Sequence, residues 1–320
     1  MEYVIISHAA DFDGIVSAAL IMRRYGISSD NVIFVDYGRD SVELGEKRFK
    51  KLFRTGATLF ITDLSAESTP DVFMRILSHA KAMRGKVFWF DHHPWSAKNI
   101  RAIASRCNVA VVGENKRFCA SEITAKELGL KDPFTNSLLK LVHISDFALT
   151  PKSSNMKSVI GGYVLGLSYY RMKGDAVYKK MLARITESIC NEDIFPPFLK
   201  QAASRFTSLN KKRLKKMIQT VIKGGIVSVA FTPIVSTNDA CNLIIKETGS
   251  DIGCYINTDS GKAHFRSIKN DCSLLAGKFG GGGHPHASGF DFSTKKYNMR
   301  TKKGRSKLAK EIISVAAAIY

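Results

Sequence analysis

YVIISHAADFDG, residues 3–14, places a run of mostly β-branched residues directly before a polar turn. The run from Tyr3 to Ile6 predicts a strand, and the spacing of apolar residues from Ile15 to Tyr25 predicts a helix that Gly26 can end. A strand, a polar turn and a helix in this order form the first repeat of an α/β fold. The turn holds three side chains that can converge on one point, namely His8, Asp11 and Asp13.

The same alternation continues through the first half of the chain. Four more strand-like runs are separated by helical patterns, at Val32–Val35, Leu59–Thr62, Val87–Phe90 and Val109–Val112. Strands that alternate with helices form parallel sheets with helices on both faces. We therefore predict a doubly wound, mainly parallel five-stranded sheet.

The second half of the chain has a different pattern. It is mainly helical from about Pro133 to Thr220, and strands return at Ile226–Phe231 before a closing helix at Ser306–Ala318. A length of 320 residues favours two domains. We expect a catalytic domain at residues 1–180, a helical connector at 181–222 and a smaller α+β domain at 223–320.

The composition favours an anionic partner. The chain carries 48 Lys and Arg against 28 Asp and Glu, a formal charge of +20, and such an excess favours binding of nucleic acid or nucleotides. A generally basic protein without such a partner has the same signature. The six cysteines are scattered without a CxxC pair, which predicts reduced, mostly buried thiols. The chain has neither a signal-peptide pattern nor a membrane-spanning run, so we expect a cytoplasmic protein without a membrane partner.

Further polar residues follow the other predicted strands. Asp63 comes directly after a strongly apolar strand, and Asp91-His92-His93 follows Val87–Phe90. Ligands in parallel α/β sheets sit at the carboxyl ends of the strands, so these side chains should gather with the first turn. Carboxylates with imidazoles suit Mn²⁺, Mg²⁺ or iron. The alternative for the first turn is helix capping, and for Asp146, in a helical segment, it is an ordinary helix-end residue.

The ordered motifs resemble the DHH phosphoesterase superfamily. They are the turn with His8, Asp11 and Asp13, then Asp63, Asp91-His92-His93 and Asp146, followed by the glycine cluster Gly280–Gly283 with His284. The last of these is similar to the hallmark of the DHHA1 domain. The resemblance covers residue 3 to about residue 318, and it implies an active-site cleft between the two domains.

The resemblance also implies the roles of individual residues. Two divalent ions, Mn²⁺ in preference to Mg²⁺, would be bound by His8, Asp11, Asp13, Asp63, His92 and Asp146, with Asp63 between them. Asp91 would orient its neighbours, and His93 would contact the substrate or assist the leaving group. On the second domain, substrate phosphate would be bound by Asn238, Arg266, Gly281, Gly282, Gly283 and His284.

Some features stay open between a functional and a structural interpretation. The glycines can present backbone N–H groups to an anion or form a flexible linker, and Arg266 can bind phosphate or form a surface ion pair. The basic segments Lys211–Lys216 and Lys295–Lys307 are solvated surface by default, although they could follow a nucleic-acid backbone. Core packing is the preferred interpretation of Phe265 and Phe279 over base stacking.

The predicted function is hydrolysis of single-stranded RNA or DNA, chiefly short oligonucleotides, to mononucleotides. The alternative enzyme is a small-molecule phosphoesterase acting on cyclic dinucleotides or 3′,5′-bisphosphonucleosides. A third hypothesis is a nucleic-acid-binding scaffold without catalysis, which the complete set of ligand residues argues against. The sequence leaves the oligomeric state open, including a homodimer.

Overall fold

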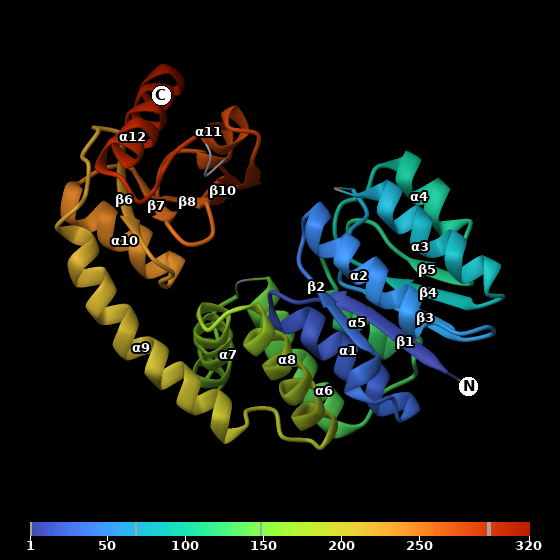
Figure 1. Ribbon diagram of the computed structural model, residues 1–320. Helices are drawn as coiled ribbons and strands as arrows, with labels where there is room; N and C mark the ends of the chain where they lie inside the picture. The colour runs from blue at the N-terminus through green and yellow to red at the C-terminus, as the bar shows by residue number, and fades with distance from the viewer. Residues whose placement is uncertain (1, 68, 148, 293–295) are drawn as a thin grey trace. The chain divides into compact units, whose positions relative to one another are not determined.

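The structure, a computed structural model, describes residues 2–67, 69–147, 149–292 and 296–320. Contacts within the chain divide it into two compact units, Met1–Ala203 and Ser204–Tyr320 (Figure 1). Helix α9 (Pro197–Ile218) runs across the division. The three-part division at residues 180 and 222 and the cleft between the domains remain predictions.

Unit 1 is built on one parallel sheet. Its strand order is β2-β1-β3-β4-β5, and every pair of neighbours is parallel. The predicted five-stranded doubly wound sheet is therefore confirmed. The strands are β1 (Tyr3–His8), β2 (Val32–Val35), β3 (Thr58–Thr62), β4 (Lys86–Phe90) and β5 (Val109–Val111).

Helices cover both faces of this sheet (Figure 1). In Figure 1, α2, α3 and α4 lie on one face, and α1, α5, α6 and α8 lie on the other. The helices of unit 1 are α1 (Phe12–Tyr25), α2 (Arg39–Leu52), α3 (Pro70–Ala82), α4 (Ala97–Ala104), α5 (Ala120–Glu127), α6 (Pro133–Asp146), α7 (Ser154–Met172) and α8 (Asp175–Cys190), with a 3₁₀ turn η1 (Ser29–Asn31).

Two apolar cores follow from the period of two along the strands. Ile5 and Phe60 are paired in register and belong to the core under α1, whereas their neighbours Ile6 and Ile61 belong to the core under α2 and α3. Since successive side chains of a strand point to opposite faces, a strand buried on both sides must be apolar throughout. This explains why the strand runs lack polar residues until they end.

Unit 2 is built on a mixed sheet with the order β6-β7-β8-β10-β9. In Figure 1, α10 lies on one face of it, whereas α11 and α12 lie on the other. The smaller α+β architecture expected for this part is confirmed. Its elements are β6 (Val227–Thr232), α10 (Thr237–Thr248), β7 (Ile252–Asn257), β8 (Lys262–Ser267), α11 (Cys272–Lys278), β9 (Gly282–His284), β10 (Ala287–Asp291) and α12 (Lys302–Ile319).

Two sequence expectations concern the protein as a whole. Four of the six cysteines are buried, as expected for thiols that pack in the core. Within the described residues, none of the helices combines the length and the apolar character that crossing a bilayer requires.

Candidate metal centre

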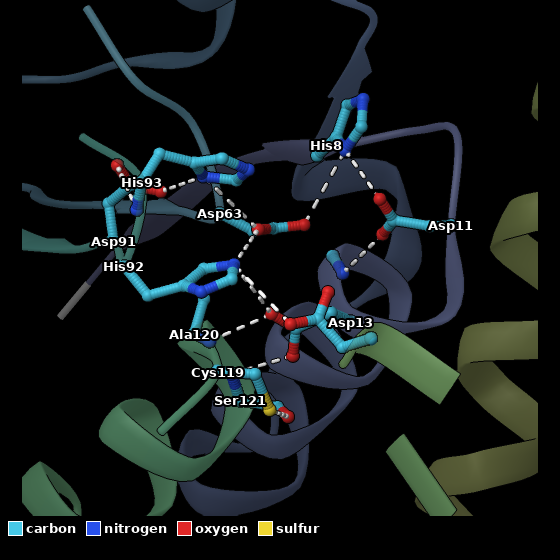
Figure 2. A network of polar contacts seen from close by, with 12 residues as sticks. His8, Asp11, Asp13, Asp63, Asp91, His92, His93, Cys119, Ala120 and Ser121 are labelled. Carbon is cyan, nitrogen blue, oxygen red and sulfur yellow. Dashed lines mark hydrogen bonds and ion pairs between the residues drawn. The ribbon is translucent and has the colours of Figure 1, made fainter. Parts of the chain in front are cut away.

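The carboxyl ends of three neighbouring strands bring the polar residues of unit 1 together (Figure 2). Strand β1 ends at His8, β3 ends immediately before Asp63, and β4 ends immediately before Asp91. Asp146, the last residue of α6, joins them from outside the sheet. The sheet edge predicted from the sequence therefore does gather these side chains.

The turn after β1 is held in shape by Asp11 and Gly14. Asp11 is the N-cap of α1, and its carboxylate accepts a hydrogen bond of 3.1 Å from the N–H of Gly14. A Cβ atom on Gly14 would lie 2.3 Å from the carbonyl oxygen of His8, so only glycine fits here. The capping interpretation of Asp11 is thus correct, and the other carboxylate oxygen still lies 3.0 Å from His8 Nδ1.

Asp13 is a buried carboxylate at the start of a second helix. Its two oxygens accept hydrogen bonds of 2.7 Å and 2.9 Å from the N–H groups of Ala120 and Ser121, in the first turn of α5 (Figure 2). A helix N-terminus stabilises negative charge through its free N–H groups and its dipole. These contacts fix the orientation of the Asp13 side chain toward the other carboxylates.

Asp63 lies between two groups of ligands (Figure 2). Its Oδ2 is 3.5 Å from His8 Nδ1, and its Oδ1 is 3.6 Å from His92 Nε2. Its backbone has a φ of 55°, a left-handed conformation that Asp and Asn tolerate better than most residues. The carboxylate of Asp63 therefore presents one oxygen to each side.

The two sides of Asp63 each form a set suited to one cation. His8, Asp11 and Asp63 form one set of atoms within 4.8 Å of one another, and Asp13, His92 and Asp146 form a second. His92 Nε2 is 3.9 Å from Asp13 Oδ2 and 3.7 Å from Asp146 Oδ2. A third set with the same spacing combines Asp63, His92 and His93.

Three buried atoms at this site fit a bound cation. Within the described residues, His8 Nδ1, Asp63 Oδ2 and His92 Nε2 are buried and make no hydrogen bond of good geometry. Buried polar atoms are nearly always satisfied, so atoms left open that point at one another call for a ligand. Oxygen and imidazole nitrogen atoms without thiolate fit Mn²⁺ or Mg²⁺.

The concentration of carboxylates shifts the pKa values of the site. Burial together with the charges of Asp11 and Asp13 raises the pKa of Asp63 to about 7. Burial lowers the pKa of His92, but Asp63, Asp13 and Asp146 outweigh it and raise the pKa to about 9. Burial and Asp13 raise the pKa of Asp146 to about 6. The site thus has an excess of negative charge that favours cations.

Asp91 does not face the ligand atoms and instead holds two neighbours. It is 1% exposed, its Oδ2 accepts a 2.6 Å hydrogen bond from Trp95 Nε1, and its Oδ1 lies 2.8 Å from His93 Nδ1. His93 is partly exposed, with 32% of its side chain accessible. This geometry agrees with the orienting role predicted for Asp91.

Two residues at the centre were missed by the sequence analysis. Tyr37 follows β2, its hydroxyl lies 3.1 Å from His93 Nε2, and its ring centroid is 4.4 Å from that of His8. Because β2 is parallel to β1, its carboxyl end reaches the same edge of the sheet, and this position was the available signal. For Trp95 the sequence offers no such signal, since its role depends on the hydrogen bond that it donates to Asp91.

The predicted phosphate-binding residues of unit 2 form a separate group. Arg266 Nε donates a 2.8 Å hydrogen bond to Asn238 Oδ1, so these two residues are neighbours as expected. Arg266 is paired across the sheet with Ala287, and Ala287 with His284. Cross-strand partners share a face, so the small Ala287 leaves space between the Arg266 and His284 side chains.

The glycine cluster is more ordered than an open loop. The N–H groups of Gly280 and Gly281 donate to the carbonyls of Gly277 and Ala276 at the end of α11, and Gly282–His284 forms strand β9. A Cβ on Gly281 would lie 2.1 Å from the carbonyl oxygen of Gly289, which explains that glycine by packing. The N–H of Gly281 is thus already used, and Gly282, Gly283 and His284 remain exposed.

Phe265 is a core residue, and the partly buried Phe279 packs against the same core. Phe265 is fully buried, and the Phe279 ring stacks on Phe290 with centroids 4.5 Å apart. The packing interpretation preferred from the sequence is therefore confirmed. Of the basic segments, Lys295 lies outside the described residues.

The fold of this chain is similar to that of solved structures, although its sequence matches no known family model. No family profile and no curated protein matches the sequence. Among solved structures, the chain is similar to RecJ from Thermus thermophilus in complex with Mn²⁺, at 14% identity and a TM-score of 0.60, over 100% of this chain and 52% of that one.

Two further solved structures are similar over most of their own length. An exonuclease RecJ bound to manganese has 14% identity and a TM-score of 0.57, over 100% of this chain and 90% of that one. The pGpG-specific phosphodiesterase PggH from Vibrio cholerae has 13% identity and a TM-score of 0.54, over 99% of both chains. The chain thus shares its fold with these solved structures over nearly its whole length.

Proposed function

We propose that this chain is a metal-dependent phosphodiesterase that hydrolyses short single-stranded oligonucleotides to mononucleotides. The observation that carries the proposal is the position of Asp63, whose two oxygens face His8 on one side and His92 on the other. A carboxylate between two ligand sets is the arrangement that a two-metal site requires.

Each ion has its own set of ligands in this proposal. His8, Asp11 and Asp63 would hold one ion, and Asp13, Asp63, His92 and Asp146 would hold the other. Structures of RecJ with Mn²⁺ and with Mg²⁺ support a divalent ion. Of the two, we propose Mn²⁺ in preference to Mg²⁺. When bound, two such ions supply a water of lowered pKa and stabilise charge on the entering and leaving oxygens.

The residues around the ions have positioning and proton-transfer roles. Asp91 holds Nδ1 of His93 and so fixes the partly exposed imidazole beside Asp63 and His92, where it can contact a substrate phosphate or donate a proton to the leaving oxygen. Asp13 is held by the start of α5, which keeps one ligand fixed without help from the ions.

Unit 2 is proposed to bind substrate phosphate. A planar guanidinium suits binding of phosphate. Arg266 Nε donates to Asn238 Oδ1 and Nη1 donates a 2.9 Å hydrogen bond to the carbonyl oxygen of Phe265, so Nη2 and the second N–H of Nη1 are left for a phosphate. His284 and the exposed Gly282 and Gly283 complete this group. The formal charge of +20 supports an anionic substrate.

A small-molecule phosphoesterase is the second candidate. The similarity to a pGpG-specific phosphodiesterase over 99% of both chains favours a substrate of dinucleotide size. A cyclic dinucleotide or a 3′,5′-bisphosphonucleoside would fit the same ligand set. The scaffold hypothesis is weaker, because every proposed metal ligand faces the centre.

Hydrolysis of end-labelled RNA and DNA oligomers of several lengths tests the proposal. The panel includes a cyclic dinucleotide and a 3′,5′-bisphosphonucleoside, each with Mn²⁺ and with chelator. We expect Mn²⁺-dependent release of mononucleotides, fastest from the shortest oligomers. Turnover of the small molecules alone would favour the second candidate, and turnover of none would favour the scaffold.

A further inference from the structure

A second hollow lies within unit 2, away from the Arg266 group. It has a volume of about 1080 Å³ and is formed by the carboxyl end of β6, the turn after β7 and the start of α12. Strand β6 is one edge of the sheet and β9 is the other, so this hollow lies at the edge opposite the glycine cluster. Its volume is slightly above the roughly 300–1,000 Å³ of typical small-molecule sites.

The wall of this hollow is basic. Arg300, Lys302 and Arg305 line it against a single carboxylate, Asp259. Arg305 Nη1 donates a 2.7 Å hydrogen bond to the carbonyl oxygen of Met299, which fixes the guanidinium at the wall. These three cations belong to the basic segment Lys295–Lys307, which the proposed hydrolysis does not use. Their excess over the carboxylate favours an anion.

The start of α12 adds to this preference. Its N-cap is Thr301, whose side chain accepts from the N–H of Gly304, and Lys302 is its first residue. The helix is 18 residues long, so its N-terminus offers free N–H groups and a positive dipole end to an anion. The cations and the start of α12 therefore both favour binding of an anion.

Thr232 also lines the hollow. Thr232 is only 6% exposed, lines the hollow, and its side chain makes no hydrogen bond within the described residues. A hydroxyl can both donate and accept a hydrogen bond, so this side chain can bind a polar group of a ligand in the hollow. Thr232 thus marks a position for a ligand hydrogen bond.

The edge of β6 supplies backbone groups as well. Val229 exchanges hydrogen bonds with Ile222 at the outer edge of β6. Since alternate residues of a strand direct their N–H and C=O groups to the same edge, those of Phe231 also point outward. Phe231, Met299 and Ile222 provide apolar surface beside these groups.

We propose that this hollow is a nucleotide-binding site, in which Arg300, Lys302 and Arg305 bind the phosphate and the edge of β6 with Thr232 binds the nucleoside. Cations at one wall and apolar surface with hydrogen-bonding groups at the other match the two halves of a nucleotide. The site goes beyond the proposed hydrolysis and does not depend on the candidate metal centre.

Calorimetric titration of the full chain with mononucleotides tests this site. AMP, GMP, CMP and UMP are titrated in the presence of chelator, in an Arg266→Ala background that weakens phosphate binding at the other group. We expect one nucleotide to bind per chain. The Lys302→Gln/Arg305→Gln double variant should bind at least about tenfold more weakly, since it loses two charge-assisted contacts.

Two control variants distinguish specific binding in the hollow from nonspecific attraction of an anion to the basic surface. Lys303 is exposed on the same helix turn but does not line the hollow, so Lys303→Gln should change affinity by less than about twofold. If the double variant fails to fold, Thr232→Val, which removes one hydroxyl, should still weaken binding about fivefold.

Three results would overturn the proposal. They are the absence of mononucleotide binding in the Arg266→Ala background, an equal loss of affinity in Lys303→Gln, and binding of inorganic phosphate as tight as that of the nucleotides. Equally tight binding of inorganic phosphate would mean that the hollow binds an anion without any contribution from the nucleoside.

Discussion

Two histidines show opposite electrostatics in the two units. In unit 1, Asp63, Asp13 and Asp146 overcome burial and raise the pKa of His92 to about 9. In unit 2, burial, Arg266 and Lys262 lower the pKa of His264 to about 4. The same side chain is therefore stabilised as a cation in one place and as a neutral group in the other. The surroundings of His92 favour positive ligands, and the surroundings of His264 favour negative ones.

The two regions also differ in how they position their groups. The carboxylates of unit 1 follow the ends of parallel strands and are fixed by N–H groups, as Asp13 is by α5. Arg266 and His284 of unit 2 stand on the face of antiparallel strands, and within that face Arg266 is held by Asn238. A two-metal site needs fixed ligands, whereas a phosphate-binding face can use longer side chains that adapt.

The largest expected effect is that of a change at Asp63. Asp63→Asn should lower turnover at least about a thousandfold, because both proposed ions share this carboxylate. Asn also tolerates a φ of 55°, so folding should be preserved. Turnover with Mn²⁺ and circular dichroism measure the two effects. Asp175→Ala removes an exposed carboxylate as the control, and wild-type turnover in Asp63→Asn would refute the shared-ligand assignment.

A change at Arg266 should have a smaller effect of a different kind. Arg266→Ala should raise KM about ten- to hundredfold while changing kcat by less than about threefold, because a charged hydrogen bond to bound phosphate is lost. Steady-state kinetics on short oligomers separate the two constants. Lys269→Ala, at an exposed position near the end of β8, is the matched control. A loss confined to kcat would assign Arg266 to the reaction step instead.

The pH dependence of stability tests the basic surroundings of His264. Its pKa is lowered to about 4 in the folded chain, so between about pH 6.5 and pH 4 the unfolded chain binds a proton that the folded chain does not. His264 should therefore reduce stability by about 2–3 kcal/mol as pH falls through this range. Denaturant unfolding of wild type and His264→Gln measures the difference, and identical pH profiles would contradict the shift.

The smallest effect is expected at Tyr37. Tyr37→Phe removes a hydroxyl that donates to the carbonyl oxygen of Asp63 and contacts His93, so kcat should fall about three- to tenfold. Tyr25→Phe, a partly exposed tyrosine elsewhere in unit 1, is the control. Unchanged kcat would limit Tyr37 to packing against His8.

The sequence predicted the fold and the gathering of acidic and histidine side chains at one edge of the sheet, because both depend on local pattern. Val32–Val35 is apolar throughout and was assigned with the same bounds that the structure has, since a strand buried on both faces has no polar position. His8, Asp63 and Asp91 could be placed because each follows such a strand. Their convergence followed from parallel topology alone.

The rest depended on contacts between distant segments. The support of Asp13 by α5 joins residues 107 and 108 positions apart, and nothing local to either segment indicates it. Helix α7 was not predicted as a separate helix, because its glycines at 161, 162 and 166 lower its helix propensity, although two of them allow close packing against Phe195 and Leu199.

Calorimetric titration with Mn²⁺ tests most directly whether Asp63 joins two cation sites. We predict about two ions bound per wild-type chain, and Asp63→Asn should weaken the binding of both because each set loses one oxygen. Asp175→Ala should bind as wild type does. If the wild-type chain bound no Mn²⁺, or if Asp63→Asn bound two ions unchanged, the two-metal account of unit 1 would be wrong.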